Sequence, residues 1–158
     1  MTTKATTNAT RVLDARKAVY ALRTFAAADF TAEEAAEKLG VPPGEVWKTL
    51  VAKGDRTGLL AAVIPTGTRL SLKKLARVSG NRTVAMVSPE EMEKATGYVK
   101  GGCSPFGMRK AMPLYVHEAA PAMPRLFVSA GQRGVQLEMA GEAFLAAAGA
   151  TAADLIEE

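Results

Sequence analysis

One stretch of the chain reads VWKTLVAK at residues 46–53, GDRTG at residues 54–58 and LLAAVI at residues 59–64. The two outer runs are rich in apolar and β-branched residues, while the middle run contains the residues that form tight turns. This pattern predicts two antiparallel strands, Val46–Lys53 and Leu59–Ile64, joined as a hairpin around Gly54 and Asp55.

Helix signals flank this hairpin. Thr31 and Glu34 form a capping box ahead of a predicted helix over Ala32–Leu39, which Gly40 would end. Asn8 or Thr10 can cap a first helix that runs to about Lys17. Further helices are predicted over Leu72–Val78, Pro89–Ala95 and Glu142–Ala148, and further strands over Val19–Phe25, Thr83–Val87, Leu114–His117, Arg125–Ser129 and Val135–Met139, with a final turn through Ile156.

The order of these elements predicts the fold class. Helices and strands are interspersed, and the late strands follow one another through short turns. We therefore expect a mixed α/β (α+β) domain whose curved, largely antiparallel, barrel-like sheet is flanked by helices. A chain of 158 residues with no linker or repeat fits one domain, which we assign to residues 9–158, with residues 1–8 as a frayed N-terminus.

Composition narrows the class of protein. Hydrophobic residues make up 48% of the chain and charged residues 23%, as in a globular protein. We find no stretch long enough to span a bilayer and no secretory signal, and the single cysteine fits a reducing cytosol, so we expect a cytoplasmic protein. The net charge of +4 permits a polyanionic partner without establishing one.

Two common kinds of hydrolytic site are disfavoured. One histidine and one cysteine cannot build a Cys/His metal cluster, and no carboxylate motif for Mg²⁺ or Ca²⁺ is present, so we expect neither a metal nor a cofactor. A Ser-His-Asp or Cys-His arrangement would have to use His117. That residue lies in a strand-like run without a nucleophile-elbow signature.

Lys48 is the first candidate for chemistry. Strand alternation places Lys48 on one face with Val46 and Leu50, and neither face of this strand is clearly polar. A lysine among apolar neighbours must reach water, an anion or a cleft. The alternative to a functional lysine is a side chain whose stem lies along the sheet while its ammonium group reaches solvent.

The second candidate is the loop Gly101–Gly107, which contains three glycines and a proline. Glycines allow a backbone to approach a ligand closely and to direct N–H groups at an oxyanion or a phosphate. The alternative is an ordinary long surface loop. Cys103 lies in this loop, but with no histidine nearby it is better explained as a small buried hydrophobe than as a nucleophile.

Five segments, in this order, resemble the YbaK/EbsC family, the stand-alone relatives of the editing domain of bacterial prolyl-tRNA synthetase. They are AAEKLG at residues 35–40, VWKTLV at 46–51, LSLKKLA at 70–76, ATGYVKGGCSPFG at 95–107 and LFVSAGQRG at 126–134. Each alone is weak, but together they extend over nearly the whole chain.

The resemblance implies an editing-domain fold and hydrolysis of the ester that links a mischarged amino acid to the 3′ end of tRNA, most often cysteine on tRNA(Pro). It implies Lys48 and Gly101 as catalytic residues. It implies substrate-binding roles for Phe25, Gly102, Cys103, Ser104, Pro105, Ser129, Gly131 and Arg133. For a cysteinyl ester, the family mechanism uses the thiol of the substrate itself, so no triad or metal is required.

The sequence also departs from the family pattern. Phe25 replaces a common tyrosine, residues 26–30 form a shortened segment, Ala130 replaces a glycine, and Gln136 replaces an often acidic or small residue. The amino acid that is removed therefore stays open. The alternatives are an editing factor for alanine or serine, and a non-catalytic module that binds tRNA or a synthetase; prolyl-tRNA synthetase is a further candidate partner.

Overall fold

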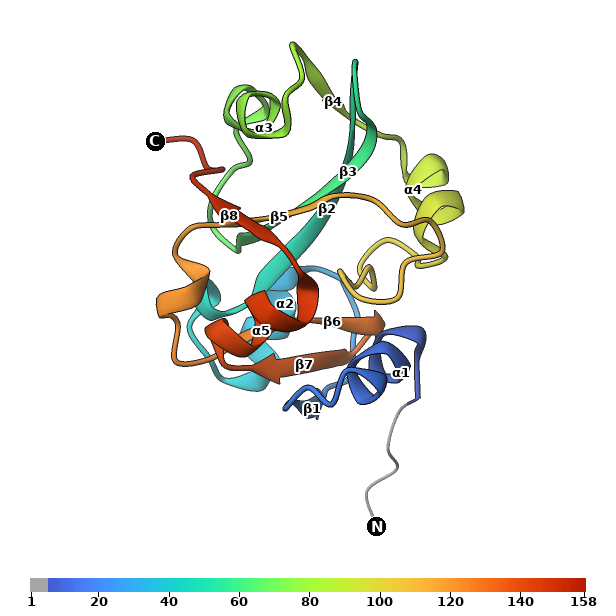
Figure 1. The fold of residues 1–158 in the computed structure, drawn as a ribbon. Coiled ribbons are helices and arrows are strands. Elements are labelled where there is room, and N and C mark those ends of the chain that lie inside the picture. Colours follow the sequence, from blue (N-terminus) through green and yellow to red (C-terminus); the bar gives the residue numbers. More distant parts are fainter. Residues whose placement is uncertain (1–5) are drawn as a thin grey trace.

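The computed structural model describes residues 6–158 (Figure 1). The helices are α1 (Asn8–Ala15), α2 (Ala32–Leu39), α3 (Leu72–Ser79), α4 (Pro89–Thr96) and α5 (Gly141–Ala148), with short 3-10 turns at η1 (Pro43–Glu45) and η2 (Ala120–Ala122). The strands are β1 (Ala21–Thr24), β2 (Trp47–Gly54), β3 (Gly58–Pro65), β4 (Val84–Met86), β5 (Leu114–His117), β6 (Leu126–Gln132), β7 (Val135–Met139) and β8 (Thr151–Ala153).

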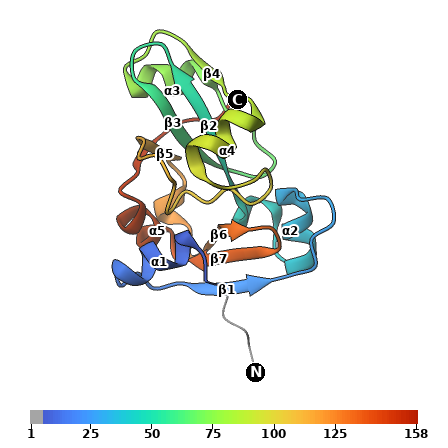
Figure 2. The ribbon, with the colours of Figure 1, turned by 90° about the vertical axis from the view of Figure 1, so that its right-hand side faces the viewer.

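The strands form two sheets. A three-stranded antiparallel sheet has the order β1-β7-β6, and a five-stranded mixed sheet has the order β4-β2-β3-β5-β8. Figure 2 shows the first sheet in the lower part of the molecule and the hairpin of β2 and β3 rising above it. A parallel bridge between Val46 and Phe127 connects the start of β2 to β6. The α+β class is confirmed, but the single curved sheet that we expected is divided in two.

The hairpin at the centre of the larger sheet agrees with the prediction. Strand β2 pairs with β3 along its whole length, from Trp47 opposite Pro65 to Gly54 opposite Gly58. Strand β3 then pairs in parallel with β5, and β5 with β8. Strand β8 was predicted only as a final turn, because three residues carry too little periodicity to indicate a strand.

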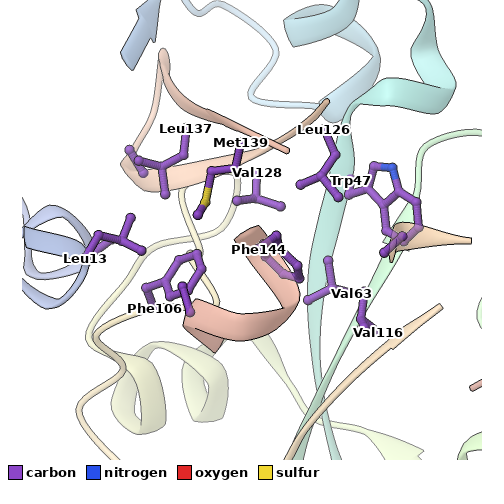
Figure 3. Close-up of a cluster of buried hydrophobic side chains, with 14 of the residues drawn as sticks. Leu13, Trp47, Val63, Phe106, Val116, Leu126, Val128, Leu137, Met139 and Phe144 are labelled. Atoms are coloured by element: carbon purple, nitrogen blue, oxygen red, sulfur yellow. The ribbon is translucent and has the colours of Figure 1, made fainter. Parts of the chain in front are cut away.

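The main hydrophobic core lies between the two sheets (Figure 3). Phe144 of α5 is fully buried there, with Leu126 and Val128 of β6 and Val63 of β3 among its cluster. Phe106, from the long loop after α4, packs edge-on against Phe144 with 5.6 Å between the ring centroids. The loop is therefore anchored in the core by one aromatic side chain.

The N-terminal helix begins differently from the prediction. Thr7 is its N-cap, in place of Asn8 or Thr10, and it forms a capping box with Thr10. The Thr7 hydroxyl also donates a hydrogen bond to the Ala130 carbonyl oxygen at 2.5 Å. Of the predicted frayed end, residues 1–5 lie outside the described residues, whereas Thr7 and Asn8 are part of the folded domain. None of the helices within residues 6–158 is long and apolar enough to cross a membrane.

Candidate active site

A cleft of about 370 Å³ opens beside the first half of β2. Its walls come from the segment between β1 and α2, from β2, from the start of α4, from the loop after α4 and from β6 and β7. The lining residues are Phe25, Ala27, Phe30, Thr31, Ala32, Glu33, Val46, Trp47, Lys48, Thr49, Leu50, Val51, Met86, Val87, Pro89, Met92, Lys100, Gly101, Cys103, Ser129, Gly134 and Gln136.

Lys48 lies on β2 two residues after the bridge from Val46 to β6. The residue is half-buried, and within residues 6–158 its ammonium group forms no hydrogen bond or salt bridge. A partly buried ammonium group without an acidic partner can bind an anionic ligand without first breaking an ion pair. Lys48 therefore supplies the cleft with a positive charge that is available to a ligand.

Gly101 reaches the same cleft because the loop after α4 is fixed at both ends. Gly97 ends α4 in the left-handed conformation. The Tyr98 hydroxyl donates to the Phe106 carbonyl oxygen at 2.6 Å, which closes the loop, while the Phe106 ring is held in the core. The buried Ser104 hydroxyl accepts a hydrogen bond from the Phe106 N–H group.

Within the segment Gly101–Gly107, the main chain offers two N–H donors at the cleft. The Gly102 N–H group bonds the Val99 carbonyl oxygen at 2.9 Å. The N–H groups of Gly101 and Cys103, in contrast, have no acceptor within residues 6–158, and both residues line the cleft. Such N–H groups can stabilise negative charge that develops on a carbonyl oxygen.

Cys103 does not have the environment of a nucleophile. Burial, which has the largest effect on this group, raises the pKa of the Cys103 thiol to about 11. The thiol is therefore protonated at neutral pH, and only a thiolate is an effective nucleophile. This result supports the prediction that Cys103 packs as a small hydrophobe.

The segment 26–30 forms the opposite rim of the cleft, and Glu34 holds it. The Glu34 carboxylate accepts hydrogen bonds from the N–H groups of Ala28, Asp29 and Phe30 at 2.9–3.2 Å. These bonds lower the pKa of Glu34, and the bond from the Asp29 N–H group has the largest effect. The predicted capping box is therefore only half correct: the Thr31 hydroxyl caps α2, but the Glu34 carboxylate caps the preceding loop instead of Thr31.

Phe30 stands at the end of this segment with a positive φ of 60° and about 40% of its surface exposed. The Arg133 guanidinium lies 3.9 Å from the centroid of the Phe30 ring. Arg133 also donates to the Lys100 carbonyl oxygen at 2.9 Å. One arginine thus ties the Phe30 rim to the loop that carries Gly101.

The structure brings about half of the predicted site residues into the cleft: Lys48, Gly101, Phe25, Cys103 and Ser129 line it. The other predicted residues, Gly102, Ser104, Pro105, Gly131 and Arg133, are not among its lining residues. Gly102, Ser104 and Pro105 lie in the loop after α4, Gly131 lies near the end of β6, and Arg133 lies in the turn between β6 and β7, where it supports the rim. Their contact with a substrate remains a prediction.

Several lining residues were not predicted from the sequence. Met86 and Met92 have no local motif that marks them. Gln136 is buried on β7, but in the alternating run Val135–Met139 it shares the polar face with Glu138, so the strand pattern gives no signal of its burial.

The charged groups of the cleft are mostly positive. Lys48 and Lys100 line it together with one acidic residue, Glu33. His117 accepts a hydrogen bond from the Leu155 N–H group and is not part of the lining. Within residues 6–158, no group of three or more histidine, cysteine or acidic side chains could hold a metal ion.

Comparison with known proteins agrees with this geometry. The family described as "Aminoacyl-tRNA editing domain" matches residues 27–147, which include every residue that lines the cleft except Phe25. The chain belongs to the aminoacyl-tRNA editing domain family. A relative from Enterococcus faecalis, named "Putative Cys-tRNA(Pro)/Cys-tRNA(Cys) deacylase EbsC", is 46% identical over 90% of this chain and 88% of its own length.

More distant members extend the comparison. The proline–tRNA ligase of Thermotoga maritima is 36% identical over 78 residues, which are 49% of this editing domain and 13% of the ligase. A crystal structure of "a putative trans-editing enzyme for prolyl tRNA synthetase" superposes with a TM-score of 0.85 at 28% identity, covering 98% of this chain and 100% of the other. The resemblance predicted from the five sequence segments is therefore confirmed.

Proposed function

We propose that this editing domain hydrolyses the ester between a wrongly attached amino acid and the terminal ribose of tRNA, with Cys-tRNA(Pro) as its main substrate. The observation that carries the proposal is that Lys48 and Gly101 line one cleft. The name of the 46% identical relative supports the choice of a cysteinyl ester.

The charges of the cleft suit the 3′ end of a tRNA. Lys48 and Lys100 provide two cations, and the phosphate before the terminal adenosine is the nearest anion to the ester that reacts. We assign Lys48 to this phosphate or to the ester itself. A fixed charge in a partly buried cleft acts more strongly than one in bulk water, because the surroundings screen it less.

The reaction needs no nucleophile from the protein. The thiol of a cysteinyl ester loses its proton, and its sulfur attacks the ester carbonyl carbon. The bond from that carbon to the ribose oxygen then breaks, the ribose oxygen takes up a proton, and water opens the cyclic thioester that results. The unpartnered N–H groups of Gly101 and Cys103 are suited to the developing oxyanion, and one such donor contributes roughly 3–4 kcal/mol in other hydrolases.

The experiment is a deacylation panel with Cys-, Ala-, Ser- and Pro-tRNA(Pro) and with Cys-tRNA(Cys). We expect the wild type to release cysteine fastest and the variant Lys48→Ala to lose at least about a hundredfold in rate. The matched control is Lys53→Ala, because Lys53 lies on the same strand, is exposed and does not line the cleft. Circular dichroism establishes that both variants fold.

The panel separates the alternatives. Faster release of alanine or serine would make the chain an editing factor for those residues. Binding of tRNA without hydrolysis would make it a non-catalytic module, and normal turnover by Lys48→Ala would refute the role of that lysine. Addition of prolyl-tRNA synthetase tests the proposed complex, which predicts sharper selection of tRNA(Pro) when the synthetase is present.

A further inference from the structure

Two polar side chains that line the cleft have buried oxygen atoms with no hydrogen-bond partner among residues 6–158. They are the carboxamide oxygen Oε1 of Gln136 and the hydroxyl oxygen Oγ1 of Thr49. Gln136 is only 7% exposed. Buried polar atoms are nearly always paired, and an unpaired acceptor in a cleft indicates a missing donor.

The strand pairing shows where Gln136 stands relative to Lys48. Gln136 lies directly opposite Ser129 in the pairing of β7 with β6. Ser129 follows Phe127 by two residues, and Lys48 follows Val46 by two residues, while Phe127 and Val46 form the bridge between β6 and β2. Because side chains two residues apart share a face, Lys48, Ser129 and Gln136 lie on the same side of these strands. Thr49 follows Lys48 by one residue and therefore points to the opposite face of β2, so Gln136 is the unpaired acceptor on the side of Lys48.

The chemistry of the Gln136 oxygen selects the donor. The carboxamide is neutral, so it can accept a hydrogen bond from a cation. A carboxylate in this position would instead pair with Lys48. An aminoacyl ester carries one strong donor group, its α-ammonium, with three N–H bonds. The thiol of a cysteinyl ester is a weak donor and must leave its proton to react.

We propose that Gln136 binds the α-amino group of the aminoacyl ester and so selects esters that carry a free amine. This inference rests on the proposed deacylase function. The Gln136 acceptor on β7 would hold the amine and thereby orient the adjacent carbonyl toward the N–H groups of Gly101 and Cys103. N-blocked esters, such as peptidyl-tRNA, would lack the donors and would be rejected.

The test removes the amine from the substrate and the acceptor from the enzyme. The two substrates are Cys-tRNA(Pro) and 3-mercaptopropionyl-tRNA(Pro), which keeps the thiol and the ester but has no amino group. The enzymes are the wild type, Gln136→Met, Gln136→Leu and a control, Gln132→Met. Gln132 is exposed on β6 and is not part of the cleft lining.

We expect Gln136→Met to lower kcat/KM about tenfold for the cysteinyl ester and to leave the value for the deaminated ester within about twofold of the wild type. Gln136→Leu should show the same pattern, and it replaces Gln136→Met if that variant does not fold. Gln132→Met should resemble the wild type with both substrates.

An equal loss with both substrates would overturn the inference, because Gln136 would then shape the cleft without reading the amine. A wild type that hydrolyses both esters at the same rate would overturn it as well, while leaving the deacylase proposal intact. Hydrolysis of neither ester would remove the proposed function and this inference together.

Discussion

Gly101 and Phe30 approach so closely that a Cβ atom at position 101 would lie 2.6 Å from both the Cβ atom and the carbonyl oxygen of Phe30. The φ angle of Gly101, +84°, also belongs to the region that side chains rarely adopt. Glycine at this position is therefore required twice, by its own backbone and by the rim of the cleft that it touches.

The first prediction concerns Gly101→Ala. The added methyl group must displace the Phe30 backbone or the loop, so we expect a loss of about 2 kcal/mol in the free energy of unfolding and more than tenfold in deacylation. Urea denaturation and single-turnover kinetics measure the two effects. The control is Gly44→Ala, because a Cβ atom there meets nothing within 4 Å and the φ of Gly44 is not positive. Equal behaviour of the two variants would contradict the role of the contact.

The second prediction concerns Glu34 and pH. Hydrogen bonds from the loop N–H groups lower the pKa of Glu34 below its ordinary value of 4.5, and the bond from Asp29 contributes most. A carboxyl whose pKa is lowered by folding stabilises the protein above its ordinary pKa, and that stability is lost as the pH falls through the folded-state pKa. We therefore expect the free energy of unfolding to fall from about pH 4.5 downward.

Glu34→Gln should remove this part of the acid dependence and should loosen the segment Ala28–Phe30. Denaturation between pH 3 and pH 7, about the range of a carboxyl titration, measures the first effect. Hydrogen exchange of the Asp29 and Phe30 amides measures the second. Glu37→Gln, at an exposed position of the same helix, is the control. If the free energy of unfolding of Glu34→Gln falls at low pH as it does in the wild type, other carboxyl groups govern this fall.

The third prediction concerns Cys103. Because burial raises the pKa of its thiol to about 11, alkylation by iodoacetamide should be slow at neutral pH and should accelerate as the pH approaches that value. The folded-state pKa exceeds the ordinary value of 9.0, so the associated stability is present below pH 9 and is lost as the pH rises from 9 toward 11. Mass spectrometry after timed alkylation measures the rate, with urea-unfolded protein as the reference. Rapid alkylation of the folded protein at pH 7 would contradict the burial of this thiol.

The fourth prediction concerns Gly131 and the ring that covers it. A Cβ atom at position 131 would lie 2.6 Å from the Tyr98 ring, and Gly131 has a φ of +96°. We expect Gly131→Ala to lower the free energy of unfolding by about 3 kcal/mol. Gly67→Ala is the matched control, since Gly67 has a similar φ of +89° and nothing within 4 Å of the added atom.

The control separates two costs. Gly67→Ala should carry only the backbone cost, about 1 kcal/mol. The difference between the two variants then measures the contact with Tyr98, whose hydroxyl closes the loop that carries Gly101. Chemical denaturation of both proteins under one set of conditions is sufficient. Equal losses would show that Tyr98 can move aside without cost.

Local signals predicted much of this fold. The β2–β3 hairpin, the Thr31 cap and the helices α3 and α4 depend on residues within a few positions of one another, and all four agree with the structure. The division into two sheets could not be predicted in the same way. It depends on a bridge between Val46 and Phe127, which are distant in sequence, and no local pattern marks that pairing.

The site was predictable to a similar degree. Lys48 stood out as a lysine in an apolar strand, and Gly101 stood out in a glycine-rich loop. Glu34, which holds the rim segment 26–30, did not stand out, because its place in a predicted capping box already explained it. Gln136 appeared only as a departure from a family pattern, and its exposure and missing partner are properties of the folded chain.

The strand that carries Lys48 has neighbours in both sheets, through Val46 on one side and along β3 on the other. The two sheets therefore cannot separate while Lys48 keeps its position in the cleft. On heating, the protein should not lose deacylation activity while it stays folded. The temperature of inactivation and the temperature of unfolding should coincide.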